Sequence, residues 1–156
     1  MRWSSAAAMA AAMLLAARPA MAEALLNGGF ESPPIVSVPG NLGSYVYING
    51  DAGFWTFLGG AGLINGNTAT PWFGGSPPQG FGGSQYAFLQ NSSSLQQSFI
   101  AQSSGLLTLS WLEAARPVIS SSAGNQNYTV HLDGTLLGSF STVSGQAFTA
   151  RSAAIV

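Results

Sequence analysis

Residues 126–140, QNYTVHLDGTLLGSF, carry the clearest structural signal in the chain. Within Gln126–Leu132 the tyrosine, the valine and the final leucine occupy every second position, which is the spacing of a strand with one apolar face. Asp133-Gly134 is typical of a two-residue hairpin turn, because glycine adopts a positive φ at little cost. The apolar pattern resumes over Leu136–Phe140. The stretch therefore predicts an antiparallel β-hairpin.

Similar short runs lie on both sides of this hairpin, and glycine, proline, asparagine and serine separate them. In the longest run, Gly105–Ala115, the side chains of Leu107, Leu109, Trp111 and Glu113 share one face. Short strands at regular spacing predict an all-β fold, either an antiparallel β-sandwich or a barrel. The other expected strands are Ser44–Asn49, Phe54–Leu58, Ser84–Gln90, Ser94–Ala101 and one from about Gln146 to Val156.

The composition excludes several classes of function. The chain has 156 residues, which suits one domain, and only 6% of them are charged. It has four arginines and no lysine, so no basic surface exists to hold a phosphate backbone, and nucleic acid is excluded as a partner. The absence of cysteine excludes disulfides, thiolate catalysis and zinc–thiolate sites. The single histidine excludes a site built on two imidazoles.

Residues 1–22 are expected to be a secretory signal peptide. Arg2 provides a positive charge, residues 6–17 consist only of alanine, methionine and leucine, and Ala20-Met21-Ala22 supplies small residues at a cleavage point. The alternative is an amphipathic or buried N-terminal helix. Export without cysteine favours a bacterial protein that is secreted or lies on the cell surface. No second apolar run of membrane length follows, so no membrane span is expected in the mature chain.

The mature part, residues 23–156, is expected to form a single β-sandwich domain. It finishes on Ala153-Ala154-Ile155-Val156, an apolar strand pattern without a turn or a polar tail behind it. Native C-termini usually end in polar residues at the surface. We therefore expect this domain to be incomplete at its C-terminus.

Four stretches, taken in order, resemble one family of domains. They are Leu25–Pro33 (LLNGGFESP), Gly53–Gly62 (GFWTFLGGAG), Pro77–Gln90 (PPQGFGGSQYAFLQ), and Ala114–Pro117 with Asn127–Gly134 and Gly138–Phe140. The chain resembles bacterial exported jelly-roll domains of the galactose-binding-like type, which occur in proteins with a PEP-CTERM sorting tail and are similar to carbohydrate-binding modules. The resemblance implies a jelly-roll β-sandwich that binds sugar. It is not extended to surface anchoring, which depends on the sorting tail.

Aromatic side chains in the glycine- and proline-rich loop of residues 65–83 indicate where a sugar would bind. A sugar ring stacks on an aromatic ring, and its hydroxyls bond to planar amides or to a guanidinium group. The alternative is that Trp72 and Phe73 fold back and plug one end of the sandwich. Gln85 and Asn91 are further hydrogen-bonding candidates. The candidate carbohydrate-binding residues are Trp72, Phe73, Gln79, Phe81, Tyr86 and Arg116.

A structural calcium ion near the start of the domain is the one cofactor that the resemblance implies. Asn27 and Glu31 occupy the matching motif and are its candidate ligands. Calcium takes six to eight oxygen ligands, and one carboxylate with one amide supplies only a few of them. The alternative is that Asn27 lies in a turn, while Glu31 caps the sheet edge or pairs with Arg116. Arg116 is equally placed to pair with Glu113.

Catalysis is not expected. The mature chain has five carboxylates and no spacing that brings two together, and no nucleophile motif accompanies His131, which lies on the outward side of its strand. The sequence therefore predicts an exported, non-catalytic β-sandwich domain that binds carbohydrate or extracellular polysaccharide weakly. The alternative, favoured by the low charge, is a structural cell-surface or extracellular-matrix protein without a sugar ligand.

Overall fold

The chain is all-β and antiparallel, which confirms this part of the fold prediction. The computed structural model describes residues 25–38, 40, 45–66, 83–101, 106–116 and 125–155, so the expected signal peptide lies outside the described residues. Within these ranges there is no α-helix, and hence none long and apolar enough to cross a membrane. The elements are a 3-10 turn, η1 (Ile35–Ser37), and the strands β1 (Tyr45–Tyr47), β2 (Gly50–Ala52), β3 (Trp55–Asn65), β4 (Gln85–Gln96), β5 (Leu107–Glu113), β6 (Gln126–Leu132), β7 (Thr135–Thr142) and β8 (Thr149–Ile155).

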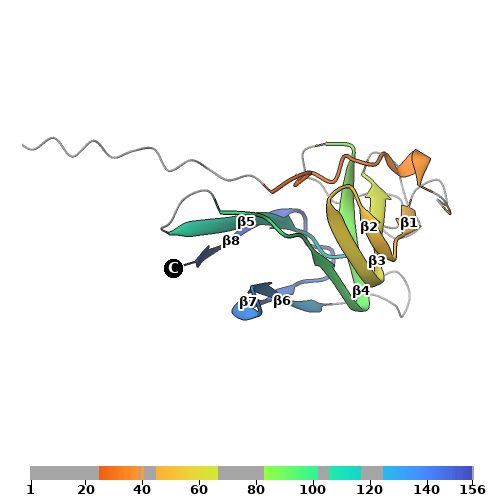
Figure 1. Cartoon of the computed structure of the whole chain (residues 1–156). Helices are drawn as coiled ribbons and strands as arrows, with labels where there is room; N and C mark the ends of the chain where they lie inside the picture. The colour runs from red at the N-terminus through yellow and green to blue at the C-terminus, as the bar shows by residue number, and fades with distance from the viewer. Residues whose placement is uncertain are drawn as a thin grey trace, which may run out of the picture.

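Strand β3 is the centre of the N-terminal sheet. β4 pairs with one edge of β3, and the short strands β1 and β2 share its other edge (Figure 1). The pairing of β3 with β4 shifts register between Leu58 and Gly60, where Gly59 adopts a φ of 70° and forms a bulge. A side chain on Gly59 would come within 2.6 Å of the Ser92 carbonyl oxygen. The bulge therefore requires glycine for both its dihedral angle and its space.

One face of this sheet packs against the opening segment, residues 25–38. Strand alternation turns apolar side chains of β1 and β3 toward that segment. Phe57 and Leu63 are each 1% exposed there. The buried core consists of Ile35, Val46, Ile48, Phe57, Ala61 and Leu63.

Side-chain amides tie the opening segment to the sheet, since the segment itself forms no strand. Gln85, which is 4% exposed, donates from Nε2 to the Pro33 carbonyl oxygen at 2.8 Å and accepts the Ile35 N–H at 2.9 Å. Gln97 accepts the Leu26 N–H and donates to the Leu26 carbonyl in the same manner. Each glutamine thus replaces the pairing that a neighbouring strand would give.

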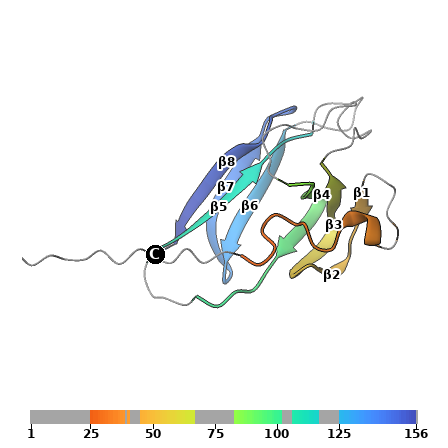
Figure 2. The same cartoon turned by 90° about the horizontal axis from the view of Figure 1, so that it is seen from above.

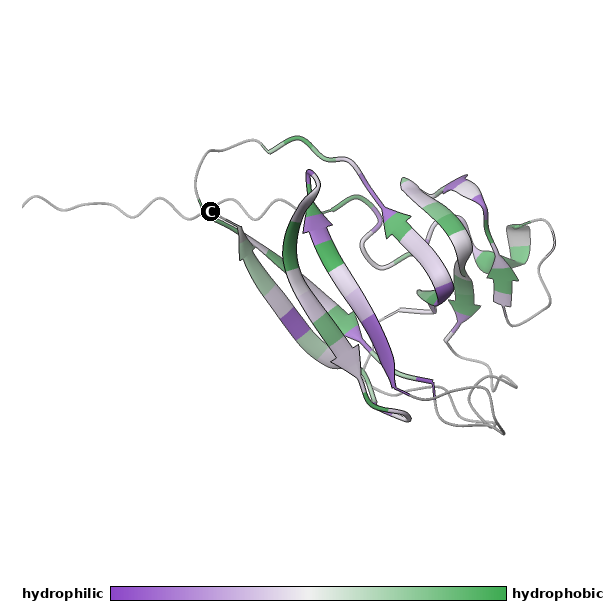
Figure 3. Cartoon of the chain, turned by 90° about the horizontal axis from the view of Figure 1, so that it is seen from below, coloured by the Kyte–Doolittle hydropathy of each residue, from purple (hydrophilic) through white to green (hydrophobic). Residues whose placement is uncertain are grey.

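The C-terminal half consists of two antiparallel ribbons, β5 with β8 and β6 with β7. The two ribbons face each other in Figure 1 and lie beside the N-terminal sheet in Figure 2. The ring of Trp111 in β5 meets the ring of Phe140 in β7 edge-on, with 5.0 Å between centroids. In Figure 3 the strands are striped in green and pale colours, as expected for strands that are apolar on one face only.

The predicted hairpin is confirmed. β6 ends at Leu132 and β7 begins at Thr135, and the two turn residues Asp133 and Gly134 have φ values of 47° and 78°. The predicted faces of β5 are also confirmed, because Trp111 and its alternate neighbours are buried or half-buried while the residues between them are exposed. Local periodicity is sufficient here, since both features depend on residues adjacent in sequence.

Other strand predictions are wrong in extent. Ser84–Gln90 and Ser94–Ala101 were expected as two strands, but β4 runs continuously to Gln96. Asn91 takes a φ of 53° without ending the strand, since asparagine tolerates this conformation better than most residues do. Asp51, which follows Asn49-Gly50, lies in β2, a short strand that the sequence did not predict.

Candidate functional site

The second face of the N-terminal sheet carries a group of aromatic side chains. In β3, Gly62 and Ile64 point to this side, because they alternate with the core residues. At one edge of β3 each of them pairs with an aromatic residue of β1, and at the other edge each pairs with an aromatic residue of β4. We call this surface the tyrosine face; it consists of Tyr45, Tyr47, Tyr86 and Phe88.

Gly62 allows the rings to meet across the central strand. A Cβ on Gly62 would lie 2.8 Å from the Phe88 ring and 2.0 Å from the Val46 carbonyl oxygen. In its absence the rings of Tyr47 and Phe88 pack edge to face, with centroids 5.2 Å apart and planes at 82°. Tyr45 packs against Tyr47 in the same way at 5.9 Å. The last glycine of the Gly53–Gly62 motif thus leaves room for rings from the neighbouring strands.

Polar groups border the most accessible ring of this face. Tyr47 is 49% exposed, and its hydroxyl donates a 2.6 Å hydrogen bond to Oε1 of Gln90. Burial and the neighbouring Tyr45 raise the pKa of the Tyr47 phenol, and the positive charge of Arg116 partly offsets that rise. An exposed ring is therefore bonded to an amide and is subject to the charge of a guanidinium group.

The tyrosine face continues into the C-terminal half of the molecule. The Tyr86 ring packs edge-on against Phe148, which precedes β8, with 5.2 Å between centroids. Burial raises the pKa of the Tyr86 phenol well above its usual value. Within the C-terminal half, backbone hydrogen bonds from Ala115 to Gln146 and from Gly145 to Arg116 join the end of β5 to the segment that precedes β8. Tyr86 is consequently the buried end of the face and Tyr47 its open end.

Two of the sequence-predicted sugar-binding residues fall at this site. Tyr86 belongs to the tyrosine face, and the charge of Arg116 acts on Tyr47. The loop that carries four other candidates joins Gly66 to Gly83, next to the point where the Gly66 N–H donates to the Ser84 carbonyl at 2.8 Å. Those four, Trp72, Phe73, Gln79 and Phe81, lie outside the described residues.

Sequence reasoning missed four members of the site, Tyr45, Tyr47, Phe88 and Gln90. The alternation in Ser44–Asn49 places both tyrosines on one face, but nothing local shows that a glycine lies opposite. Gln85 was expected to reach a sugar, and this is wrong. Its amide is buried and occupied by the opening segment.

The two calcium candidates are engaged by protein groups. Asn27 donates from Nδ2 to the Gly53 carbonyl at 2.8 Å and accepts the Ser32 N–H at 3.0 Å. Both carboxylate oxygens of Glu31 accept hydrogen bonds from Ser84, one of them also from the Gln85 N–H. A calcium ion requires six to eight oxygens that converge and are free to bind it. Asn27 and Glu31 as arranged do not fit such a cage.

These contacts also explain the opening motif. Glu31 caps the start of β4, as the alternative interpretation of this residue predicted. Burial alone would raise its pKa, but the hydroxyl and N–H of Ser84 and the N–H of Gln85 lower it overall. At Gly53, φ is 57° and a Cβ would lie 1.6 Å from the Ser32 carbonyl oxygen. The motif brings two backbone segments into direct contact.

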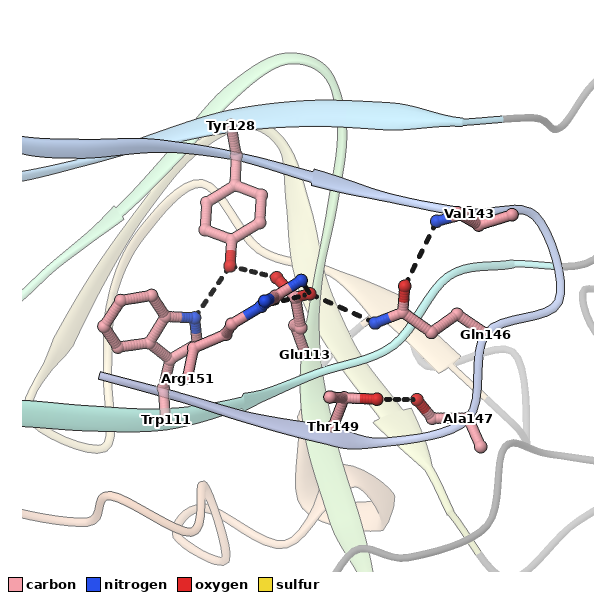
Figure 4. Close-up of polar contacts among 8 residues, drawn as sticks. All are labelled: Trp111, Glu113, Tyr128, Val143, Gln146, Ala147, Thr149 and Arg151. Atoms are coloured by element: carbon pink, nitrogen blue, oxygen red, sulfur yellow. Dashed lines mark hydrogen bonds and ion pairs between the residues drawn. The ribbon is translucent and has the colours of Figure 1, made fainter. Parts of the chain in front are cut away.

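A second polar group lies between the two C-terminal ribbons (Figure 4). Glu113 is 6% exposed, and its Oε1 lies 2.7 Å from Nη2 of Arg151 and accepts a 3.1 Å hydrogen bond from Nε2 of Gln146. The Tyr128 hydroxyl donates to the other carboxylate oxygen and accepts the indole N–H of Trp111 at 2.8 Å. We call these five residues the Glu113 cluster; it links β5, β6 and β8.

The ion pair of Glu113 differs from the expected one. Its partner is Arg151, whereas the sequence offered Arg116 as a partner of either Glu113 or Glu31. Burial alone would raise the pKa of Glu113, but hydrogen bonds from Tyr128, Gln146 and Arg151, with the charge of Arg151, lower it. Burial and the bond to Glu113 raise the pKa of Tyr128 to about 12. Both carboxylate oxygens of Glu113 thus have partners, and the cluster is a structural contact.

The described carboxylates all have a structural role. Asp51 accepts a hydrogen bond from Thr56, and Asp133 forms the hairpin turn. Glu31 and Glu113 are held as given above. Among the described residues, no three histidine or acidic side chains gather where a metal ion could be held. Comparison with protein-family models, with curated proteins and with solved structures gives no match to this chain.

Proposed function

We propose that this protein is an exported, non-catalytic β-sandwich domain of jelly-roll type that binds extracellular polysaccharide weakly. The observation that carries the proposal is the open end of the tyrosine face. There the half-exposed Tyr47 ring is fixed by Phe88 and by the hydrogen bond to Gln90, and Arg116 is near enough to act on it. A sugar would stack on this ring and bond to the amide and the guanidinium group.

Two further observations support binding without catalysis. The described carboxylates already serve turns, caps or the ion pair, which leaves no facing pair for acid–base work on a glycosidic bond. His131 is exposed on β6. The ring on which a sugar would stack is also pre-organised, because its neighbours hold it in place before any ligand arrives.

The binding experiment is a pull-down of the full chain on a panel of insoluble and soluble polysaccharides, combined with a thermal melt. Tyr47→Ala should weaken binding about tenfold or more, since one stacked ring contributes on the order of 1–3 kcal/mol. Tyr47→Phe keeps the ring and should retain most of the binding. Leu58→Ala removes an exposed apolar side chain from the same sheet and serves as the control. Equal binding by Tyr47→Ala and by this control would refute the site.

The loop of residues 65–83 is tested separately with Trp72→Ala. Lost binding with an unchanged melting temperature would assign Trp72 to the ligand. A stability loss of about 3–5 kcal/mol would instead assign it to a buried plug, as truncation of a core tryptophan does. Export has its own test, which is mass spectrometry of the secreted protein. We expect the mature chain to begin at Glu23, and an intact Met1 would contradict this.

A structural role in a surface layer or matrix is the second candidate function. Exposed apolar side chains near the end of β4 and the start of β5 favour it, namely Phe99, Ile100 and Leu106. If the wild-type protein self-associates and binds no polysaccharide of the panel, the structural role is favoured over polysaccharide binding. Ile100→Ser should then reduce self-association.

A further inference from the structure

The ribbon of β6 and β7 has an outer face that the proposed function does not use. The rings of Tyr128 and Phe140 stack with 5.4 Å between centroids and point inward, where Trp111 packs against Phe140. Because strand side chains alternate, the residues on either side of these rings point outward. The outward residues are Asn127, Thr129, Ser139 and Ser141, and all four are exposed.

These four side chains line an open groove of about 440 Å³, together with Tyr128 and Phe140. None of its lining residues belongs to β5 or β8, so the groove lies on the outer face of the ribbon and not between the ribbons. The register places Asn127 opposite Ser141 and Thr129 opposite Ser139. Two cross-strand polar pairs thus lie about 7 Å apart along the ribbon.

The inner face keeps this groove in a fixed shape. An isolated two-stranded ribbon is marginally stable in water. Here the Tyr128 hydroxyl is bound to Glu113 and to the Trp111 indole, and Phe140 packs on that same indole. The two rings beneath the polar pairs are consequently anchored to β5. The backbone that carries the four outer side chains is therefore held in place by β5.

The chemistry of the groove selects its ligand. Three hydroxyls and one amide provide both donors and acceptors, and none of them is charged. Tyr128 is also neutral at physiological pH, as an ordinary tyrosine is, and its pKa is raised further to about 12. An anionic ligand would find no cation among the described lining residues. A peptide strand would pair along an edge of the ribbon, whereas the groove lies on its face.

We infer that the outer face of the β6–β7 ribbon is a second site, which binds a stretch of neutral polysaccharide by hydrogen bonds. The ligand class rests on the proposed function, while the site itself does not depend on the tyrosine face. Two weak sites on one domain let a long polymer bind more tightly than a short oligosaccharide, because the second contact is intramolecular. The volume of the groove lies within the range of ordinary ligand sites.

The test uses the full chain and a glycan array that carries neutral and uronic-acid oligosaccharides, followed by affinity electrophoresis in the matching long polymer. Thr129→Val with Ser139→Ala removes both hydroxyls of one cross-strand pair. We expect this double variant to weaken binding to the long neutral polymer about tenfold, since two hydrogen bonds are lost. Thr108→Val with Ser110→Ala removes two exposed hydroxyls from β5 and should bind as the wild type does.

The outcomes separate the second site from the tyrosine face. Equal binding by the groove variant and the β5 control would overturn the second site, whatever Tyr47→Ala does. Weakened binding in the groove variant with no effect of Tyr47→Ala would retain the groove and reject the tyrosine face. A wild-type protein that binds only uronic-acid glycans, or no glycan of the array, would also overturn the inference. Circular dichroism melts of both double variants confirm that they fold.

Discussion

The two halves of this molecule use the same strand pattern and are stabilised in different ways. In the N-terminal sheet, alternation produces an apolar core, because the opening segment covers the inner face of three strands side by side. In the C-terminal half, two narrow ribbons face each other around an ion pair and aromatic rings. Of its described residues, the buried ones are Glu113, Ala115 and Thr142.

The comparison shows that alternation alone does not make a core. A two-stranded ribbon is too narrow to remove many side chains from water, whereas a wider, covered sheet does so. The Glu113 cluster takes the place of apolar contacts where the ribbons meet. We therefore expect the N-terminal half to depend on packing and the C-terminal half on charge and hydrogen bonding.

The largest expected effect is on the packed half. Phe57→Ala removes a ring that is 1% exposed at the centre of the N-terminal core, and should lower the free energy of unfolding by about 3–5 kcal/mol. Leu109→Ala in β5 truncates a half-buried side chain and should cost clearly less. Denaturant unfolding followed by circular dichroism measures both variants. A larger loss for Leu109→Ala would reverse the comparison.

Glu113→Ala should produce the next largest loss, confined to the C-terminal half. It leaves Arg151, Gln146 and Tyr128 without their common acceptor. Arg151 is 39% exposed and can turn to water, so the loss comes mainly from the half-buried Tyr128 and Gln146 and should total about 1–3 kcal/mol. Hydrogen exchange should rise in β5 and β8 but not in β3. Asp51→Ala, which removes an exposed carboxylate, is the control and should change little. Faster exchange throughout β3 would show that the halves are not separable.

Acid should weaken the C-terminal half more than the N-terminal core, because that core is apolar. The pKa of Glu113 is lowered in the folded protein from an ordinary value of 4.5, so its contribution is complete above that value and is lost as the pH falls through the lowered pKa. Fluorotryptophan NMR follows the two halves through Trp111 and Trp55. We expect the Trp111 signal to change more than the Trp55 signal as the pH falls through the lowered pKa of Glu113.

Two outcomes bear on this acid prediction. Glu31 also has a lowered pKa, because Ser84 and Gln85 donate hydrogen bonds to its carboxylate. When acid protonates Glu31, these bonds weaken and the opening segment loosens, so the Trp55 signal should show a small change of its own. Glu113→Gln should remove the acid dependence of the Trp111 signal. Simultaneous changes at both tryptophans in this variant would argue against independent halves.

The smallest expected effect is at the hairpin turn. Gly134 has a φ of 78° and open space around it, so Gly134→Ala adds strain without a clash and should cost about 1 kcal/mol. Gly62→Ala in the N-terminal sheet should cost more, because the new Cβ would meet the Val46 carbonyl oxygen at 2.0 Å. Paired thermal melts compare the two. Equal losses would mean that β1 shifts to accommodate the methyl group.

Local features of this protein could be predicted from the sequence. The Asp133-Gly134 turn depends on two adjacent residues, and the inward face of β5 depends on alternation over seven. The candidate site was predictable only in part. Tyr86 and Arg116 were identified, while Tyr47 and Gln90 were not, because they come from strands that pair with β3 across a glycine.

The partner of Glu113 shows where sequence reasoning ends. By itself the sequence determined that Glu113 faces inward, since its strand neighbours alternate. Arg116, three residues away in the chain, was the partner that the sequence offered, with Glu31 as the alternative acid for that arginine. Only the tertiary structure decided for Arg151, because the register of β5 with β8 sets Arg151 opposite Trp111 and diagonal to Glu113, within reach of a long side chain. Strand periodicity acts between neighbours in sequence, whereas sheet register depends on how distant segments pair, and that information is not local.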